Sequence, residues 1–128
     1  MSDFRPSQIT GDIGVTIDQI NTNNAVISVG FQSSVPTNTL TTIATVPSNG
    51  LKYITKIICS GMENAKWDIY IDNVRNITKR TISRTVDFDF STPLRLAATS
   101  VLDVKATHHG PDSTADFEAT VLGYAVIP

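Results

Sequence analysis

The sequence has little of what several protein classes require. Its single cysteine among 128 residues, Cys59, cannot form an internal disulfide, which is typical of proteins that fold in a reducing compartment. No run approaches eighteen apolar residues, so we expect no membrane-spanning helix and no membrane partner. The first residues, MSDFRPSQITGD, lack the basic start and apolar run of a signal peptide, and we therefore expect folding in the cytoplasm.

Positive charge is also scarce. Ten Lys and Arg face twelve Asp and Glu, which gives a formal net charge of −2 and a pI of about 5.5. The longest basic run is the pair Lys79-Arg80. A nucleic-acid binder normally needs a basic stripe to displace counterions from phosphates, so we expect no nucleic-acid partner.

Residues for catalysis or metal binding are few. The sequence has no G-x-S-x-G motif, no phosphate-binding glycine loop and no metalloprotease motif. Its two histidines, His108 and His109, are adjacent, and on a strand neighbouring side chains point to opposite faces. In a loop they could converge with Asp112, but structural zinc sites usually have better spaced ligands. We therefore expect no metal, no cofactor and no enzymatic activity.

From residue 25 onward, short apolar and β-branched segments alternate with turn signals, and no helical period appears. Such spacing predicts an all-β domain, an antiparallel β-sandwich that is a jelly roll of about eight strands, over residues 25–128. Residues 1–24 are polar with isolated Ile and Val, which predicts an extended arm or an edge strand. The expected strands cover residues 25–31, 39–46, 51–59, 66–72, 75–83, 84–90, 100–107 and 116–127, with 94–98 as a strand or a loop.

Local signals within these segments predict further details. Asn49-Gly50 accepts the positive φ of a tight hairpin, and Asp72-Asn73 tolerates a left-handed turn. Ser91-Thr92-Pro93 is expected to end a strand. The only tryptophan, Trp67, alternates in phase with Ile69 and Ile71, which favours a core position over a ligand platform.

Three stretches together resemble a known family. ITKIICSGMENAKWDIYIDN, FDFSTPLRLAATSVLDVKATHHG and ADFEATVLGYAV, within about residues 40–127, are similar to small β-sandwich virion proteins of tailed bacteriophages. The resemblance implies a jelly-roll capsid cement or decoration protein on the virion surface. It implies that the protein binds the major capsid protein and assembles as a homo-oligomer, often a trimer. Other such proteins form parts of head or tail fibres.

Two strongly apolar segments and the arm are the expected contact surfaces. Apolar residues on both faces of residues 53–58 and 121–127 exceed what one thin core needs, which is typical of protein–protein interfaces. The arm could add a strand to a neighbour's sheet. The expected subunit interface comprises Tyr53, Ile54, Ile58, Val121, Leu122, Tyr124 and Val126, and the expected capsid-binding arm comprises Phe4, Ile9, Ile13, Val15 and Ile17.

Two alternatives remain open at this stage. A receptor- or glycan-binding module of a head or tail fibre would use exposed aromatic and polar side chains, for which Tyr70 and the loop 108–112 are the candidates. A cupin-like metalloenzyme would need several histidines beside a carboxylate, and two adjacent histidines are too few.

Overall fold

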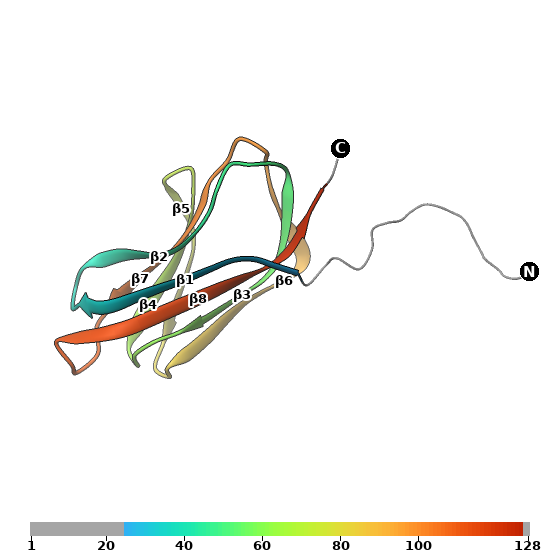
Figure 1. Cartoon of the computed structure of the whole chain (residues 1–128). Helices are drawn as coiled ribbons and strands as arrows, with labels where there is room; N and C mark the ends of the chain where they lie inside the picture. The colour runs from blue at the N-terminus through green and yellow to red at the C-terminus, as the bar shows by residue number, and fades with distance from the viewer. Residues whose placement is uncertain (1–24, 127–128) are drawn as a thin grey trace, which may run out of the picture.

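The described part of the chain, residues 25–126 of the computed structural model, consists of eight β-strands without a helix. None of these residues therefore forms a helix that could cross a membrane. The strands form two four-stranded sheets that pack face to face (Figure 1). They are β1 (Ala25–Pro36), β2 (Leu40–Val46), β3 (Lys52–Ser60), β4 (Ala65–Ile71), β5 (Val74–Thr81), β6 (Thr85–Leu96), β7 (Leu102–His108) and β8 (Thr114–Ala125).

The strand order is that of a jelly roll. One sheet, here called sheet A, has the order β1-β8-β3-β6, and the other, sheet B, has the order β2-β7-β4-β5. All pairs are antiparallel, and the first four strands pair with the last four in nested order: β4 with β5, β3 with β6, β2 with β7 and β1 with β8. The predicted all-β sandwich of eight antiparallel strands is thus confirmed.

The core lies between the inner faces of the two sheets. Strand alternation places one side of each inner strand there, as in β7, where Leu102, Val104 and Ala106 are buried while the residues between them are half-buried. Trp67 and Ile69 of β4 are fully buried in the same layer, so the prediction of a core tryptophan is confirmed. Burial of such a side chain contributes roughly 2–3 kcal/mol through the hydrophobic effect.

An aromatic cluster joins the sheets at one end of the sandwich. Phe117 of β8 packs against Trp67 of β4, with ring centroids 5.5 Å apart, and against His108 of β7 at 5.7 Å. Gly61 lies against the same ring, because a Cβ at that position would be 2.4 Å from Phe117 Cδ2. The aromatic cluster therefore needs a glycine at position 61. The cluster lies directly beneath the loops at that end of the sandwich.

The β4–β5 turn follows its prediction. Ile71 pairs with Val74, and the two residues between them, Asp72 and Asn73, have φ values of 52° and 66°, the conformation of a two-residue hairpin turn. The Asp72 carboxylate accepts hydrogen bonds from the Val101 N–H and the Ser100 hydroxyl. These bonds, first the one from Val101, lower the pKa of Asp72.

Two other local predictions are wrong. Asn49-Gly50 does not form a hairpin, because β2 and β3 lie in different sheets and the loop crosses between them. Lys52 holds this loop by donating hydrogen bonds to the carbonyls of Pro47 and Gly50. Ser91-Thr92-Pro93 does not end a strand, because β6 continues to Leu96. An edge strand tolerates proline, and the pairing with β3 skips residues 90–93.

Strand β1 approaches sheet B closely at Gly30. A Cβ on this glycine would lie 1.9 Å from the Ile43 carbonyl oxygen and 2.6 Å from Ala44 Cα, both backbone atoms of β2. The Ser28 hydroxyl donates a hydrogen bond to the Thr45 carbonyl nearby, at 2.8 Å. Contact with β2 therefore holds β1, the edge strand of sheet A, against sheet B.

The substitution Gly30→Ala should destabilise the fold. Its methyl group collides with backbone that can move only by separating β1 from β2, so we expect a loss of about 2–3 kcal/mol in the free energy of unfolding. Chemical denaturation measures this loss. Ser33→Ala on the same strand is the control and should change stability by less than about 0.5 kcal/mol, since Ser33 is exposed. Equal stability of the two variants would contradict the close contact.

Candidate functional site

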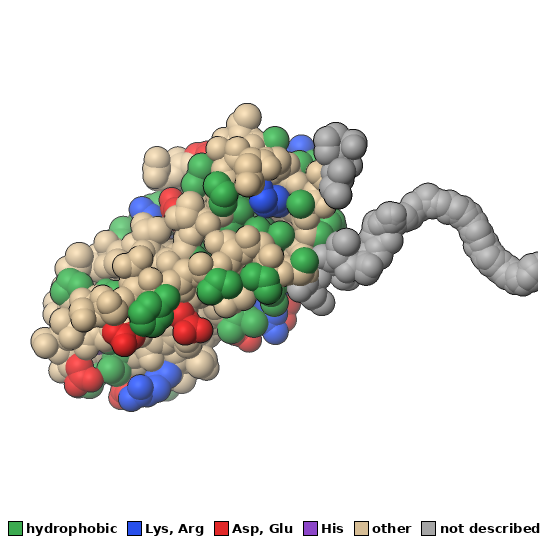
Figure 2. Space-filling model, viewed as in Figure 1, with side chains coloured by type: hydrophobic (Ala, Val, Ile, Leu, Met, Phe, Trp, Pro, Cys, Tyr) green, Lys and Arg blue, Asp and Glu red, His purple; other side chains and the backbone are tan. Residues whose placement is uncertain are grey.

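The outer face of sheet A is unusually apolar. Cross-strand pairing aligns its side chains in rows: Val29 of β1 and Ile58 of β3 flank Thr120 of β8, and Tyr53 of β3 stacks on Tyr124 of β8 with ring centroids 5.3 Å apart. Figure 2 shows hydrophobic side chains gathered where β1 and β8 run. The surface, here called the apolar face, comprises Val26, Val29, Phe31, Tyr53, Ile58, Leu122 and Tyr124.

Strand β1 contributes the most exposed part of this face. The exposed fractions of Val26, Val29 and Phe31 are 60%, 63% and 57%. Scattered exposed apolar residues are ordinary, but three large ones on one strand, continuous with half-buried Leu122, form a contiguous patch. Such a patch is the surface feature that typically marks a protein–protein contact.

Charged side chains stand within the rows of the apolar face, where Lys56 of β3 lies opposite Leu122 of β8. Glu118 of β8 lies opposite Phe31, and Lys56 of β3 forms an ion pair with Asp87 of β6, with 3.8 Å between Nζ and Oδ2. The apolar face is therefore interrupted by charge on β3 and β8 and is most continuous along β1.

The structure divides the predicted interface residues into two groups. Ile54 and Val121 are wrong as surface residues, because both are fully buried in the core. The segment around Ile54 seemed apolar on both faces because a register irregularity between Ile54 and Lys56 turns Ile54 and Ile57 inward together. The remaining five, Tyr53, Ile58, Leu122, Tyr124 and Val126, are exposed or half-buried.

Sequence reasoning missed the β1 residues of this face. Val26, Val29 and Phe31 do not alternate strictly, because the β1–β8 register shifts between Val26 and Ser28. The signal that was available is the small inward residue, Gly30, between two large ones. Gly30 faces the core, so its neighbours Val29 and Phe31 lie on the outer face.

The two histidines have separate environments. His108 is fully buried, and both ring nitrogens are engaged: the Gly110 N–H donates to Nδ1 at 3.1 Å, and Nε2 lies 2.7 Å from the Asp112 carbonyl oxygen. Because Nδ1 accepts a hydrogen bond, the ring is the neutral Nε2–H form and holds the loop from inside. His109 is exposed, and its Nδ1 lies 3.0 Å from Asn38 Oδ1.

The three weak metal candidates therefore do not come together as ligands. His108 has no lone pair available, and Asp112 meets it through its backbone carbonyl. Within residues 25–126, no group of three or more His, Cys, Asp or Glu side chains is placed to hold a metal ion.

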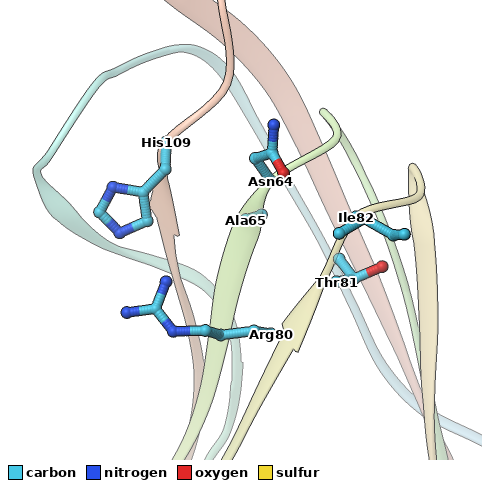
Figure 3. Close-up of a pocket in the computed structure, with 6 residues that line it drawn as sticks. All are labelled: Asn64, Ala65, Arg80, Thr81, Ile82 and His109. Carbon is cyan, nitrogen blue, oxygen red and sulfur yellow. The ribbon is translucent and has the colours of Figure 1, made fainter.

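A pocket of about 330 Å³ opens at the end of the sandwich next to His109 (Figure 3). Its walls come from the β3–β4 turn, the end of β5 and the β7–β8 loop. In the close-up, the Arg80 guanidinium and the His109 ring lie on the same side of the strands and face each other across a gap. The lining residues are Asn64, Ala65, Arg80, Thr81, Ile82 and His109, none of them acidic.

The aromatic residues proposed for glycan stacking are largely occupied. Trp67 is in the core. Lys105 Nζ lies over the Tyr70 ring, 4.4 Å from its centroid, a cation–π contact that covers one face of the ring. Beside it, Asp68 is buried, accepts a hydrogen bond from the Thr78 hydroxyl and lies 4.0 Å from Lys66 Nζ.

The predicted arm or edge strand of residues 1–24 lies outside the described residues, and so do its contact candidates Phe4, Ile9, Ile13, Val15 and Ile17. The arm's role therefore stays a prediction. Comparison with known proteins adds no family: no family model and no curated protein matches the sequence.

Cys59 faces the core on β3. Burial, first of all, and the charge of Asp87 raise the pKa of its thiol to about 12. The thiolate is the reactive form, so the folded protein presents an inert thiol at neutral pH.

Thiol labelling tests this environment. At pH 8 the thiolate fraction at a pKa of about 12 is roughly a thousandfold smaller than at the ordinary value of 9.0, so Ellman's reagent should label native protein far more slowly than protein unfolded in guanidinium. Because the unfolded thiol loses its proton first, stability should also fall as the pH rises above about 9. Equal labelling rates would contradict a buried Cys59.

Proposed function

We propose that this protein is a virion structural protein of a tailed bacteriophage, a capsid decoration protein that binds and stabilises the lattice of the major capsid protein. The observation that carries the proposal is the apolar face of a jelly roll, with its most exposed part on the edge strand β1. Such a face supports a role in assembly. The resemblance of residues 40–127 to phage β-sandwich virion proteins supports a phage capsid as the assembly.

The physical role needs no chemistry. A protein that binds an assembled shell more tightly than its free subunits stabilises the shell by mass action. Several copies joined together multiply weak contacts, because each further contact forms within one complex. The proposed form is a homotrimer on the capsid surface.

The apolar face fits contact between copies. A face that packs on itself produces a two-fold dimer, whereas a ring of three requires the face of one copy to meet a different surface of the next. Strand β1 lies at the edge of sheet A, so Val26, Val29 and Phe31 can meet such a neighbour without obstruction from another described strand.

Association of the purified protein tests this contact. Val29→Glu places a charge in the centre of the face and should lower self-association at least tenfold, since burying an unpaired carboxylate is costly. Light scattering across a concentration series measures the mass, with a trimer expected for the wild type. Thr42→Glu, an exposed change on β2, is the matched control and should remain a trimer. A monomeric wild type, or equal masses for both variants, would contradict the proposed interface.

Particle survival tests the function itself. Phage particles assembled without this protein should release their genome at a lower temperature than complete particles. When the salt is diluted stepwise, they should also release it at a salt concentration that complete particles still survive. Adding purified wild-type protein should restore survival. Equal survival of depleted and complete particles would contradict a stabilising role.

The alternative function is a receptor- or glycan-binding module of a head or tail fibre. The half-buried Tyr53–Tyr124 pair on the apolar face is the aromatic surface that favours it. A glycan array distinguishes the two, because a decoration protein that acts through protein contacts should bind no glycan.

A further inference from the structure

We propose that the pocket lined by Arg80 and His109, here called the Arg80 pocket, binds an acidic side chain of a partner protein. The proposal stands independently of the function proposed above. It concerns sheet B and the loops at one end of the sandwich, whereas that function rests on the apolar face of sheet A.

Arg80 supplies the main attraction. Its guanidinium forms no hydrogen bond or ion pair with another residue in the range 25–126, and none of the pocket's lining residues is acidic. Guanidinium presents a planar set of donors that matches a carboxylate, and such charge-assisted hydrogen bonds are about twice as strong as neutral ones. An unpaired guanidinium in a pocket is therefore suited to a carboxylate.

Two carboxylates on adjacent elements have cationic partners other than Arg80. Glu63 pairs with Arg84 at 3.8 Å, and Asp68 lies 4.0 Å from Lys66 Nζ. Lys66 is also the residue opposite Arg80 across the β4–β5 pair, so it adds positive charge to that side of the pocket. The local field thus favours an anion from outside the chain.

His109 completes the polar wall. Because its Nδ1–H donates to the Asn38 amide oxygen, Nε2 of the neutral ring is an acceptor, and the hydrogen bonds to a bound carboxylate would come from Arg80. The ring faces the guanidinium in Figure 3. A carboxylate bound by the guanidinium would have the imidazole as a neighbouring wall.

The frame of the pocket is held by backbone hydrogen bonds. The His109 N–H donates to the Asn64 carbonyl at 3.0 Å, and the Asn38 N–H donates to the His108 carbonyl at 2.9 Å. Gly61 N–H donates to the Arg84 carbonyl at 2.8 Å and ties the β3–β4 turn to the β5–β6 turn. A site whose walls are fixed in advance loses less entropy when it binds.

The rim indicates a peptide. Ile82, with an exposed fraction of 88%, is the most exposed large apolar residue in the described range and stands beside the polar wall. A partner segment in which an acidic residue is next to an apolar residue would match the guanidinium of Arg80 beside the side chain of Ile82. A sugar acid would need a flat aromatic surface for its ring, and none of the six lining residues is aromatic apart from the imidazole.

Nuclear magnetic resonance titration tests the site. Acetyl-Ile-Glu-amide should produce saturable shifts in the backbone amides of Ala65 and Thr81, and acetyl-Ile-Gln-amide, which differs only in charge, should bind at least tenfold more weakly. Arg80→Gln should weaken binding of the Glu peptide at least tenfold, and His109→Gln should weaken it less. Arg75→Gln is the matched control, an exposed arginine at the other end of β5, and should bind like the wild type.

Three outcomes would overturn the proposal. The first is no shift with the Glu peptide at about 10 mM, and the second is equal binding of the Glu and Gln peptides. The third is Arg80-dependent binding of N-acetylneuraminic acid without binding of the peptide, which would assign the pocket to a glycan. The amide spectrum of Arg80→Gln shows directly that the variant is folded, so loss of binding cannot be confused with loss of structure.

Discussion

The ring of Phe117 holds the two sheets and one set of loops together. It comes from sheet A and packs against Trp67 and His108 of sheet B. His108 extends this contact outward, because its two ring nitrogens fix the backbone of the loop that follows β7. The positions of His109, Asn64 and Arg84 then follow through backbone hydrogen bonds. An aromatic core contact thereby sets the geometry of the surface above it.

The outer faces of the two sheets differ in chemistry although their inner faces form one core. Sheet A presents Val29, Phe31 and Ile58, whereas sheet B presents Lys66 and Lys105. On sheet B several polar side chains pair with one another, as in the hydrogen bond from Thr45 to Asp103 at 2.7 Å, and Arg80 is left without such a partner among the described residues. Apolar surface lowers its free energy by leaving water, while satisfied polar surface does not. Sheet A therefore suits the proposed contact between copies, and sheet B suits the proposed charge-directed recognition.

The sequence predicts the fold well because strand alternation and turn residues are local signals. Asp72-Asn73 was correctly predicted as a left-handed turn, since the two residues need only their own conformational preference. Asn49-Gly50 was misread because the sequence at a turn does not tell whether the next strand returns to the same sheet. The candidate site was less predictable: bulges in β1 and β3 changed which residues face out, so Ile54 was misplaced and Val29 missed. The Arg80 pocket joins turns that are distant in sequence, and only the fold brings them together.

The nested pairing of the strands also favours an order in which the strand pairs form during folding. β4 and β5 are joined by two residues and can pair with almost no loss of loop entropy, whereas β1 and β8 must close nearly the whole described chain. We expect the hairpin to form early and the β1–β8 pair to form last. Val26, Val29 and Phe31 lie on β1, so the apolar face is completed only in the final step. A partly folded molecule would thus lack the full apolar face, and in the proposed assembly only completely folded subunits would be able to join a neighbour.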